Sequence, residues 1–225
     1  FFASPLSHGR NKLQLTRLLL AGVDVDRDGT DDIDGTQLAY LGVSLGGIMG
    51  GELAALTDAY GAVVLVVPGG RVSSIIIDSA TFRPIIGLVT PPGTSMGDID
   101  RFFPVLQTVL DRGDAASYGP HIIRDRLPPA GTRIPSVLLG VVLDDDTVPN
   151  SSNYALARAI GVDVVPPTLR PEVGLGETSA APYRFFHTSF PEYIARNKLS
   201  ATERDDCHRL LAAACAAWRR LPEPA

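Results

Sequence analysis

The chain has 225 residues, the size of one domain, and 45% of them are hydrophobic, which is enough for a core and speaks against a disordered chain. Its formal net charge is -5 at pH 7, so a nucleic acid is not an expected partner. The longest apolar runs, residues 62–68 and 137–143, have the length of strands and are too short to cross a bilayer, so no transmembrane segment is expected.

A helix is predicted near the start of the chain. Leucines at positions 13, 15, 18, 19 and 20 give an apolar face with helical spacing over about residues 11–21. The residues before it do not have the pattern of a secretory signal peptide, because Phe1 and Phe2 lead directly into Ala3, Ser4 and Pro5.

An acidic stretch follows this helix. Asp24, Asp26 and Asp28 occupy alternate positions and precede Gly29, as in the first half of a calcium-binding loop. The twelfth position of such a loop falls on Gly35, where an EF-hand requires a bidentate glutamate, so a true EF-hand is disfavoured. Two interpretations remain: a solvated acidic turn that leads into the next strand, or a looser structural calcium site formed by Asp24, Asp26, Asp28 and Asp32.

The central motif of the sequence begins at residue 38. Residues 38–41 have the composition of a buried strand, residues 42–46 (Gly-Val-Ser-Leu-Gly) match the Gly-x-Ser-x-Gly nucleophile elbow, and residues 47–49 open a helical pattern. Glycines two before and two after the serine leave room for a sharp turn that exposes its hydroxyl. Ser44 is therefore the predicted nucleophile, and the amide of Leu45 is a predicted oxyanion donor at a helix N-terminus. The competing interpretation is an ordinary strand–turn–helix junction.

The remaining pattern predicts an α/β fold with a mostly parallel sheet flanked by helices. Residues 62–67 read as a strand buried on both faces, which completes a right-handed βαβ unit with the elbow helix. Residues 71–130 depart from this alternation of strands and helices. They are predicted to form a helical lid insertion whose apolar faces line an acyl-binding pocket, the alternative being ordinary packing helices. A single domain is then expected, with its core in residues 11–70 and 131–225, and the N-terminal strands of such a sheet are expected to be missing because the elbow comes early.

A nucleophilic serine needs a base, and the base needs an orienting acid. The next strand is expected within residues 135–143, and three aspartates follow it. Asp145 is preferred because two spacer residues separate it from Val148 and Pro149, a spacing frequent among hydrolases with this elbow. Asp144 and Asp146 remain alternatives, Asp78 is a remote one, and a solvated turn is the non-catalytic interpretation. Residues 151–153 are predicted to cap the helix that follows.

The base is predicted at His187. It follows an expected last strand at residues 183–186 and, of the four histidines, it alone follows both the acid and a terminal strand. His208 is expected to be structural within a closing helix at residues 201–220, His121 precedes the acid strand, and His8 with Gly9 resembles an oxyanion motif but follows no strand. Cys207 and Cys215 stand about 12 Å apart on that closing helix, too far for a disulfide, and are expected to be free thiols.

The chain resembles bacterial extracellular lipases and esterases of the α/β-hydrolase superfamily, of the virulence-factor lipase type. Two stretches carry the resemblance: the acidic loop, with Asp26-Arg27-Asp28-Gly29 and Asp32-Ile33-Asp34, and the sequence Leu-Gly-Val-Ser-Leu-Gly-Gly-Ile-Met-Gly at residues 41–50. The resemblance implies Ser44 as nucleophile, Asp145 as acid, His187 as base and the Leu45 amide as one oxyanion donor. It also implies a secreted or cell-envelope protein. The segment that normally supplies the second oxyanion donor is not identifiable.

The expected function is hydrolysis of a small-molecule or lipid ester through a Ser-His-Asp triad and an acyl-enzyme, with no required cofactor. The alternative is a non-catalytic interaction module, stabilised by calcium, on a truncated hydrolase scaffold.

Overall fold

The computed structural model describes residues 5–165 and 174–176. By its internal contacts the chain divides into two units, Phe1–Val164 with Leu169–Gly176, and Val165–Thr168 with Glu177–Ala225. All described residues except Val165 belong to the first unit. The strand expected at residues 183–186, the base His187, and the helix expected at 201–220 with His208, Cys207 and Cys215 lie outside the described residues.

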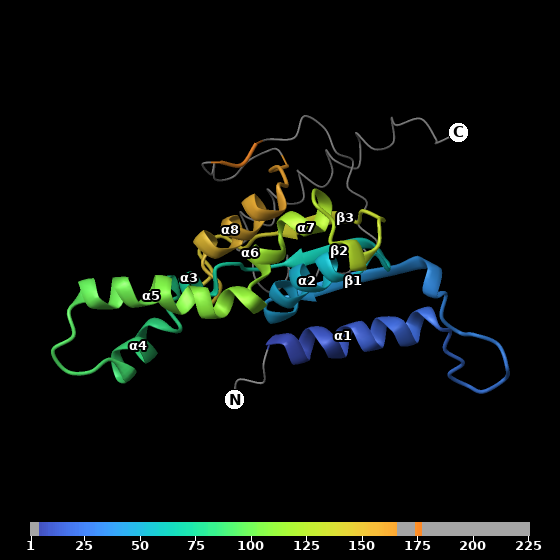
Figure 1. Cartoon of the computed structure of the whole chain (residues 1–225), viewed down its shortest axis with the longest axis horizontal. Coiled ribbons are helices and arrows are strands. Elements are labelled where there is room, and N and C mark those ends of the chain that lie inside the picture. The colour runs from blue at the N-terminus through green and yellow to red at the C-terminus, as the bar shows by residue number, and fades with distance from the viewer. Residues whose placement is uncertain (1–4, 166–173, 177–225) are drawn as a thin grey trace, which may run out of the picture. The chain divides into compact units, whose positions relative to one another are not determined.

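The first unit contains a three-stranded parallel sheet, which bears out the predicted α/β class. Its strands lie in the order β1 (Leu38–Val43), β2 (Tyr60–Val66) and β3 (Ser136–Gly140) (Figure 1). α2 (Leu45–Leu56) joins β1 to β2, so these three elements form the predicted βαβ unit. Val43 of β1 and Gly140 of β3 both pair with Val66, so the carboxyl ends of all three strands lie level at one edge.

The other helices occupy three parts of the chain. α1 (Pro5–Leu20) precedes the sheet, followed by the short 3-10 turn η1 (Gly35–Gln37). α8 (Asn150–Ile160) follows β3. Between β2 and β3 lie α3 (Val72–Asp78), α4 (Arg83–Val89), α5 (Met96–Leu110), η2 (Asp111–Gly113), α6 (Ala115–Tyr118), α7 (Pro120–Ile123) and η3 (Pro128–Ala130).

The main core forms on one face of the sheet. Val63 and Leu65 of β2 are at most 1% exposed and pack with residues of α2, α6, α7 and α8: Leu53, Ala115, Ile122, Leu156 and Ile160. Alternate residues of a strand point to opposite faces, so Val64 and Val66 lie on the other face, where they are only half-buried. There the neighbouring Leu41 of β1 is 61% exposed. The expectation that β2 is buried on both faces is therefore met on one face only.

The predicted helix at residues 11–21 is confirmed, and it begins earlier, at Pro5. Thr16 anchors it through a buried 2.6 Å hydrogen bond between its hydroxyl and that of Tyr60 in β2. His8 and Gly9 lie within α1. A His-Gly oxyanion motif requires a loop after a strand, so the structure agrees with the rejection of that motif.

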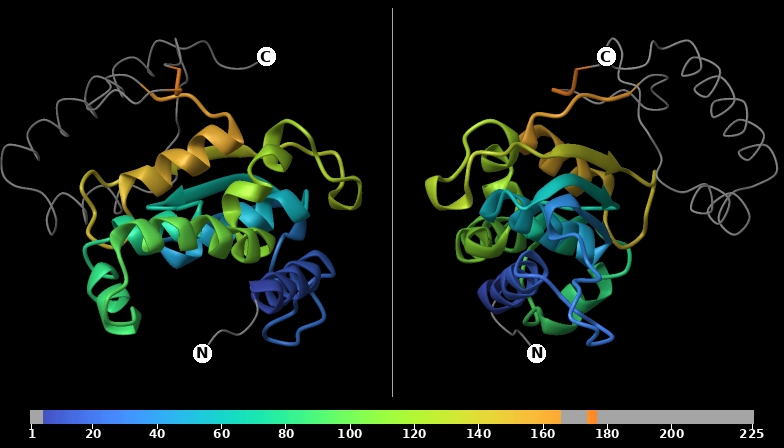
Figure 2. Two further views of the ribbon diagram at one scale, coloured as in Figure 1. Left: turned by 60° about the vertical axis from the view of Figure 1, so that its left-hand side comes forward. Right: turned by 90° about the vertical axis from the view of Figure 1, so that its right-hand side faces the viewer.

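The segment predicted as a lid divides into two parts. Ala115 of α6 and Ile122 of α7 belong to the main core, so the end of the segment supports the sheet rather than covering a site. α4 and α5, by contrast, lie to one side, and α4 is the part farther from the sheet (Figures 1 and 2). Their exposed side chains include Ile85, Leu88, Val89, Phe102, Val105 and Val109.

Two predicted boundaries near the acid are wrong. The strand expected to continue to Leu143 ends at Gly140, because Asn150 donates from its amide nitrogen to the carbonyl of Val142 and accepts from the amide of Asp144, which draws the chain out of the sheet. Residues 151–153 do not cap α8: the N-cap is Pro149, without a side-chain cap hydrogen bond. Ser152 and Asn153 lie inside the first turns and are fully buried.

Within the described part of the chain, no single helix is both long and apolar enough to cross a membrane.

Candidate active site

Ser44 stands in a strained backbone conformation at the junction of β1 and α2. Its φ of 53° and ψ of -119° fall in a region that residues with a Cβ rarely adopt. Hydrogen bonds on both sides hold it there: its amide donates to the carbonyl of Val66 at 2.9 Å, and its carbonyl accepts from the amide of Ile48 at 2.9 Å. The side chain is exposed at the edge of the sheet, as a nucleophile elbow requires.

Two glycines make this turn sterically feasible. A Cβ on Gly42 would collide with the carbonyl of Gly46, and a Cβ on Gly47 would come within 2.9 Å of the carbonyl oxygen of Val66. Gly46 itself has open space where a Cβ would lie. The predicted need for glycine is therefore confirmed at Gly42, but on the helix side the crowded position is Gly47 rather than Gly46.

Tyr40 supports the turn, a role that was not predicted from the sequence. Its hydroxyl donates to the carbonyl of Gly46 at 2.8 Å, and its ring lies against Gly50. Burial raises the pKa of this hydroxyl, with the adjacent Tyr60 adding to the effect. Tyr40 therefore stays protonated and able to donate over the whole neutral range.

The first amides of α2 face the same edge as Ser44. The first N–H groups of a helix have no partner within that helix, and they carry the positive end of its dipole. The amide of Leu45 is the first of these in α2. This N–H group can therefore donate to an anion bound beside Ser44.

The three candidate acids differ in how their carboxylates are held. Oδ1 of Asp145 accepts hydrogen bonds from the amides of Thr147 at 2.9 Å and Val148 at 2.7 Å, and the residue is half-buried. Asp144 and Asp146 are exposed. Asp146 is fixed through its backbone, because its carbonyl accepts from the hydroxyl of Ser79 at 2.8 Å. Two backbone amides therefore orient the carboxylate of Asp145.

The topology brings the serine and this turn to the same edge of the sheet. Ser44 follows β1 and Asp145 follows β3, and β2 lies between these strands. Since neighbouring strands are about 4.8 Å apart, the ends of β1 and β3 are separated by roughly 10 Å.

A shallow cavity of about 330 Å³ opens beside the acid turn, defined as residues 141–149. Its lining residues include Asp78, Asp144, Asp145 and Asp146. Asp78, the remote alternative acid, accepts a 2.6 Å hydrogen bond from the hydroxyl of Ser151. The cavity makes the acid turn accessible from solvent.

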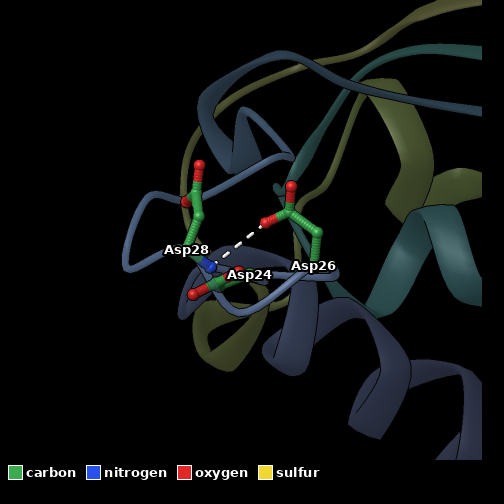
Figure 3. A group of neighbouring side chains, drawn as sticks. All are labelled: Asp24, Asp26 and Asp28. Carbon is green, nitrogen blue, oxygen red and sulfur yellow. Dashed lines mark hydrogen bonds between the residues drawn. The ribbon is translucent and has the colours of Figure 1, made fainter.

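The acidic loop brings together three of its four predicted ligands. Carboxylate oxygens of Asp24, Asp26 and Asp28 lie within 4.8 Å of one another (Figure 3). Each also accepts backbone amides of the loop: Asp26, for example, accepts that of Asp28 at 3.1 Å. Asp32 is not in this group and accepts the amide of Val25 instead. Exposed acidic groups are common without a bound ion, so the three carboxylates by themselves identify no metal.

His121 has a structural role. Its Nδ1 lies 2.7 Å from the carbonyl oxygen of Asp125 at the end of α7. This agrees with its exclusion as the base.

Buried polar residues around the loop after β2 were also missed. Asp114, fully buried, accepts hydrogen bonds from the amides of Arg71 and Val72. Ser152 and Asn153 donate to the carbonyls of Gly70 and Pro68. In the sequence, Ser152 and Asn153 follow Pro149 at the start of a predicted helix. This pattern suggests helix capping and gives no sign of contacts with the loop after β2.

Neither a scan against protein-family models nor a search of curated proteins finds a match to this chain. Function is therefore inferred from the geometry of Ser44, the N-terminus of α2 and the acid turn.

Proposed function

We propose that this chain is a serine carboxylic-ester hydrolase with an α/β-hydrolase-type active site. The observation that supports this most strongly is the backbone of Ser44, which is held at a positive φ between a parallel strand and a helix N-terminus. Strain of this kind costs about 1–3 kcal/mol and persists where function requires it. Asp145, oriented by two amides, lies at the same edge of the sheet.

In the proposed mechanism, His187 takes the proton from Ser44 Oγ while the oxygen attacks the acyl carbonyl. The Leu45 amide stabilises the oxyanion of the tetrahedral intermediate, and Asp145 stabilises the imidazolium. His187 then protonates the leaving alcohol, and the C–O bond to it breaks. Water, deprotonated by His187, attacks the resulting acyl-enzyme, and proton return to Ser44 Oγ releases the acid.

We propose acyl esters, small-molecule or lipid, as substrates. The apolar side chains exposed on α4 and α5 offer a surface for an acyl chain. No cofactor is needed for this chemistry, and secretion or a cell-envelope location fits the same class of enzyme.

The proposal is tested with a fluorophosphonate probe, on which an activated serine displaces fluoride, and with p-nitrophenyl butyrate. We expect labelling at Ser44 in the wild type. We expect Asp145→Asn to slow both reactions by orders of magnitude, whereas Asp144→Asn and Asp146→Asn, the matched controls one position away, leave them nearly unchanged. Equal losses in all three variants would contradict the choice of Asp145.

A folded wild-type chain that is neither labelled nor active would overturn the hydrolase proposal. If its melting temperature also rose with added calcium, the alternative of a calcium-stabilised, non-catalytic module would be supported. Labelling at Ser44 excludes that alternative.

The acyl-chain surface gives a separate prediction. Phe102 and Val109 of α5 are 57% and 71% exposed, so replacing both with serine should not destabilise the fold. We expect the double variant to lose kcat/KM on p-nitrophenyl octanoate by about tenfold while activity on the acetate stays unchanged, because only the longer chain reaches the apolar surface. Arg101→Ser, on the same helix, is the control. Equal effects on both esters would refute this role for α5.

A further inference from the structure

A chain of polar contacts connects the acid turn to the segment beside the nucleophile elbow. Asn150, the first residue of α8, holds both sides of the turn: Nδ2 donates to the carbonyl of Val142 at 2.7 Å, and Oδ1 accepts from the amide of Asp144 at 2.8 Å. Asp145 is the next residue. Its placement therefore depends on the position of the Asn150 side chain.

The chain continues inward through a second asparagine. Asn150 Nδ2 also donates to Oδ1 of Asn153 at 2.9 Å, and Nδ2 of Asn153 donates to the carbonyl of Pro68 at 2.5 Å. Asn153 is fully buried. Such a group is held in one orientation, because any other would leave its amide unsatisfied.

Pro68 lies directly against the elbow helix. Its Cα is 3.2 Å from the position that a Cβ on Gly47 would occupy. The carbonyl of Val66, two residues before Pro68, accepts a hydrogen bond from the amide of Ser44. The segment that anchors Asn153 is thus in contact with the residues that set the serine.

We propose that Asn150 is a positioning residue for the proposed hydrolysis: it fixes Asp145 relative to Ser44, and Asn153 anchors it to the segment beside the elbow. This inference rests on the proposed function. Neither asparagine touches the reacting atoms. Their effect is on the geometry of the triad, where a displacement of about 1 Å can cost on the order of a hundredfold in rate.

The test compares Asn150→Ala, Asn153→Ala and Ser151→Ala in p-nitrophenyl butyrate hydrolysis, its pH profile, fluorophosphonate labelling and melting temperature. Ser151 lies between the asparagines but bonds to Asp78, outside this chain of contacts, and is the matched control. We expect Asn150→Ala to lower kcat by about tenfold or more with little change in KM. Should the alanine variant fail to fold, Asn150→Asp takes its place. This variant keeps the oxygen that accepts from the amide of Asp144 and loses the hydrogen bonds that Nδ2 donates to Val142 and Asn153.

The pH profile separates positioning from a merely structural role. The acidic limb of kcat/KM reports protonation of the base, and a nearby carboxylate raises the pKa of an imidazole. With Asp145 displaced, the limb should move to lower pH, in the direction that Asp145→Asn moves it. The other acidic residues at the cavity, Asp78, Asp144 and Asp146, are unchanged in the alanine variants and so form a constant background. Asn150→Asp adds a carboxylate at this cavity, so that variant is compared in kcat, KM and labelling and not in its pH profile.

We expect the buried Asn153→Ala to lower the melting temperature more than Asn150→Ala but to move the acidic limb less, because Asn150 keeps its two bonds to the turn. If the wild type is active and Asn150→Ala matches Ser151→Ala in kcat and pH profile, the positioning role is refuted and the hydrolase proposal stands. An inactive wild type overturns both.

Discussion

Replacing Ser44 with alanine should lower kcat for p-nitrophenyl butyrate by about 10⁴- to 10⁶-fold, because the proposed mechanism has no other nucleophile. Fluorophosphonate labelling should disappear with it. The folded state should be nearly unaffected, since alanine keeps the Cβ and the same backbone geometry. Undiminished activity in this variant would remove Ser44 from the mechanism.

Ser44→Gly separates the catalytic role of the residue from its structural cost. Glycine adopts a positive φ without the steric penalty of a Cβ, and removing that penalty stabilises the folded state by about 1–3 kcal/mol. Glycine also makes the unfolded chain more flexible, which lowers the stability by roughly 0.5–1 kcal/mol. We therefore expect an inactive variant that is more stable than both wild type and Ser44→Ala by about 1 kcal/mol. Urea unfolding of the three proteins measures this. A Ser44→Gly variant less stable than Ser44→Ala would show that the turn is not strained.

The largest loss of stability is expected for Asp114→Ala. Its carboxylate is fully buried and accepts four hydrogen bonds, from the amides of Arg71, Val72 and Ala116 and from the side chain of Gln107. Without the carboxylate these four donors lose their acceptor at a position that is itself fully buried. We expect the free energy of unfolding to fall by about 3–5 kcal/mol.

The control is Asp111→Ala, three residues away. Asp111 is exposed and accepts one hydrogen bond from the same glutamine, at 2.7 Å. Its loss should cost at most about 0.5 kcal/mol. Similar midpoints of urea unfolding for the two variants would mean that the contacts of Asp114 do not stabilise the loop after β2.

The elbow was predictable from the sequence because its constraints are local. Gly42 and Ser44 lie within one turn, and the apolar run before them and the helical pattern after them define a strand and a helix whatever surrounds them. The same locality explains the near agreement of β1, α2 and β2 with the predicted segments. Local spacing also favours Asp145 over its two neighbours as the acid, and that choice stays a prediction.

Periodicity failed where long-range contacts decide the structure. The apolar run before the acid turn is strand-like throughout, but β3 stops at Gly140 because Asn150, which follows in another element, binds the chain at Val142 and Asp144. Asn153 was predicted from the sequence to cap the helix. Its partner, the carbonyl of Pro68, is fixed only when α8 packs beside the loop after β2.

The sequence by itself thus determined the α/β class, the parallel connection of the first two strands, and a serine in a turn that glycine must flank, because these follow from side-chain size and apolar spacing over a few residues. Only the tertiary structure decided which glycine is crowded and which partners the buried Asn153, Ser152 and Asp114 bind in the loop after β2. The reason is physical: the hydrogen-bond partners of a buried polar group come from segments distant in the chain, and they exist only once those segments have packed together.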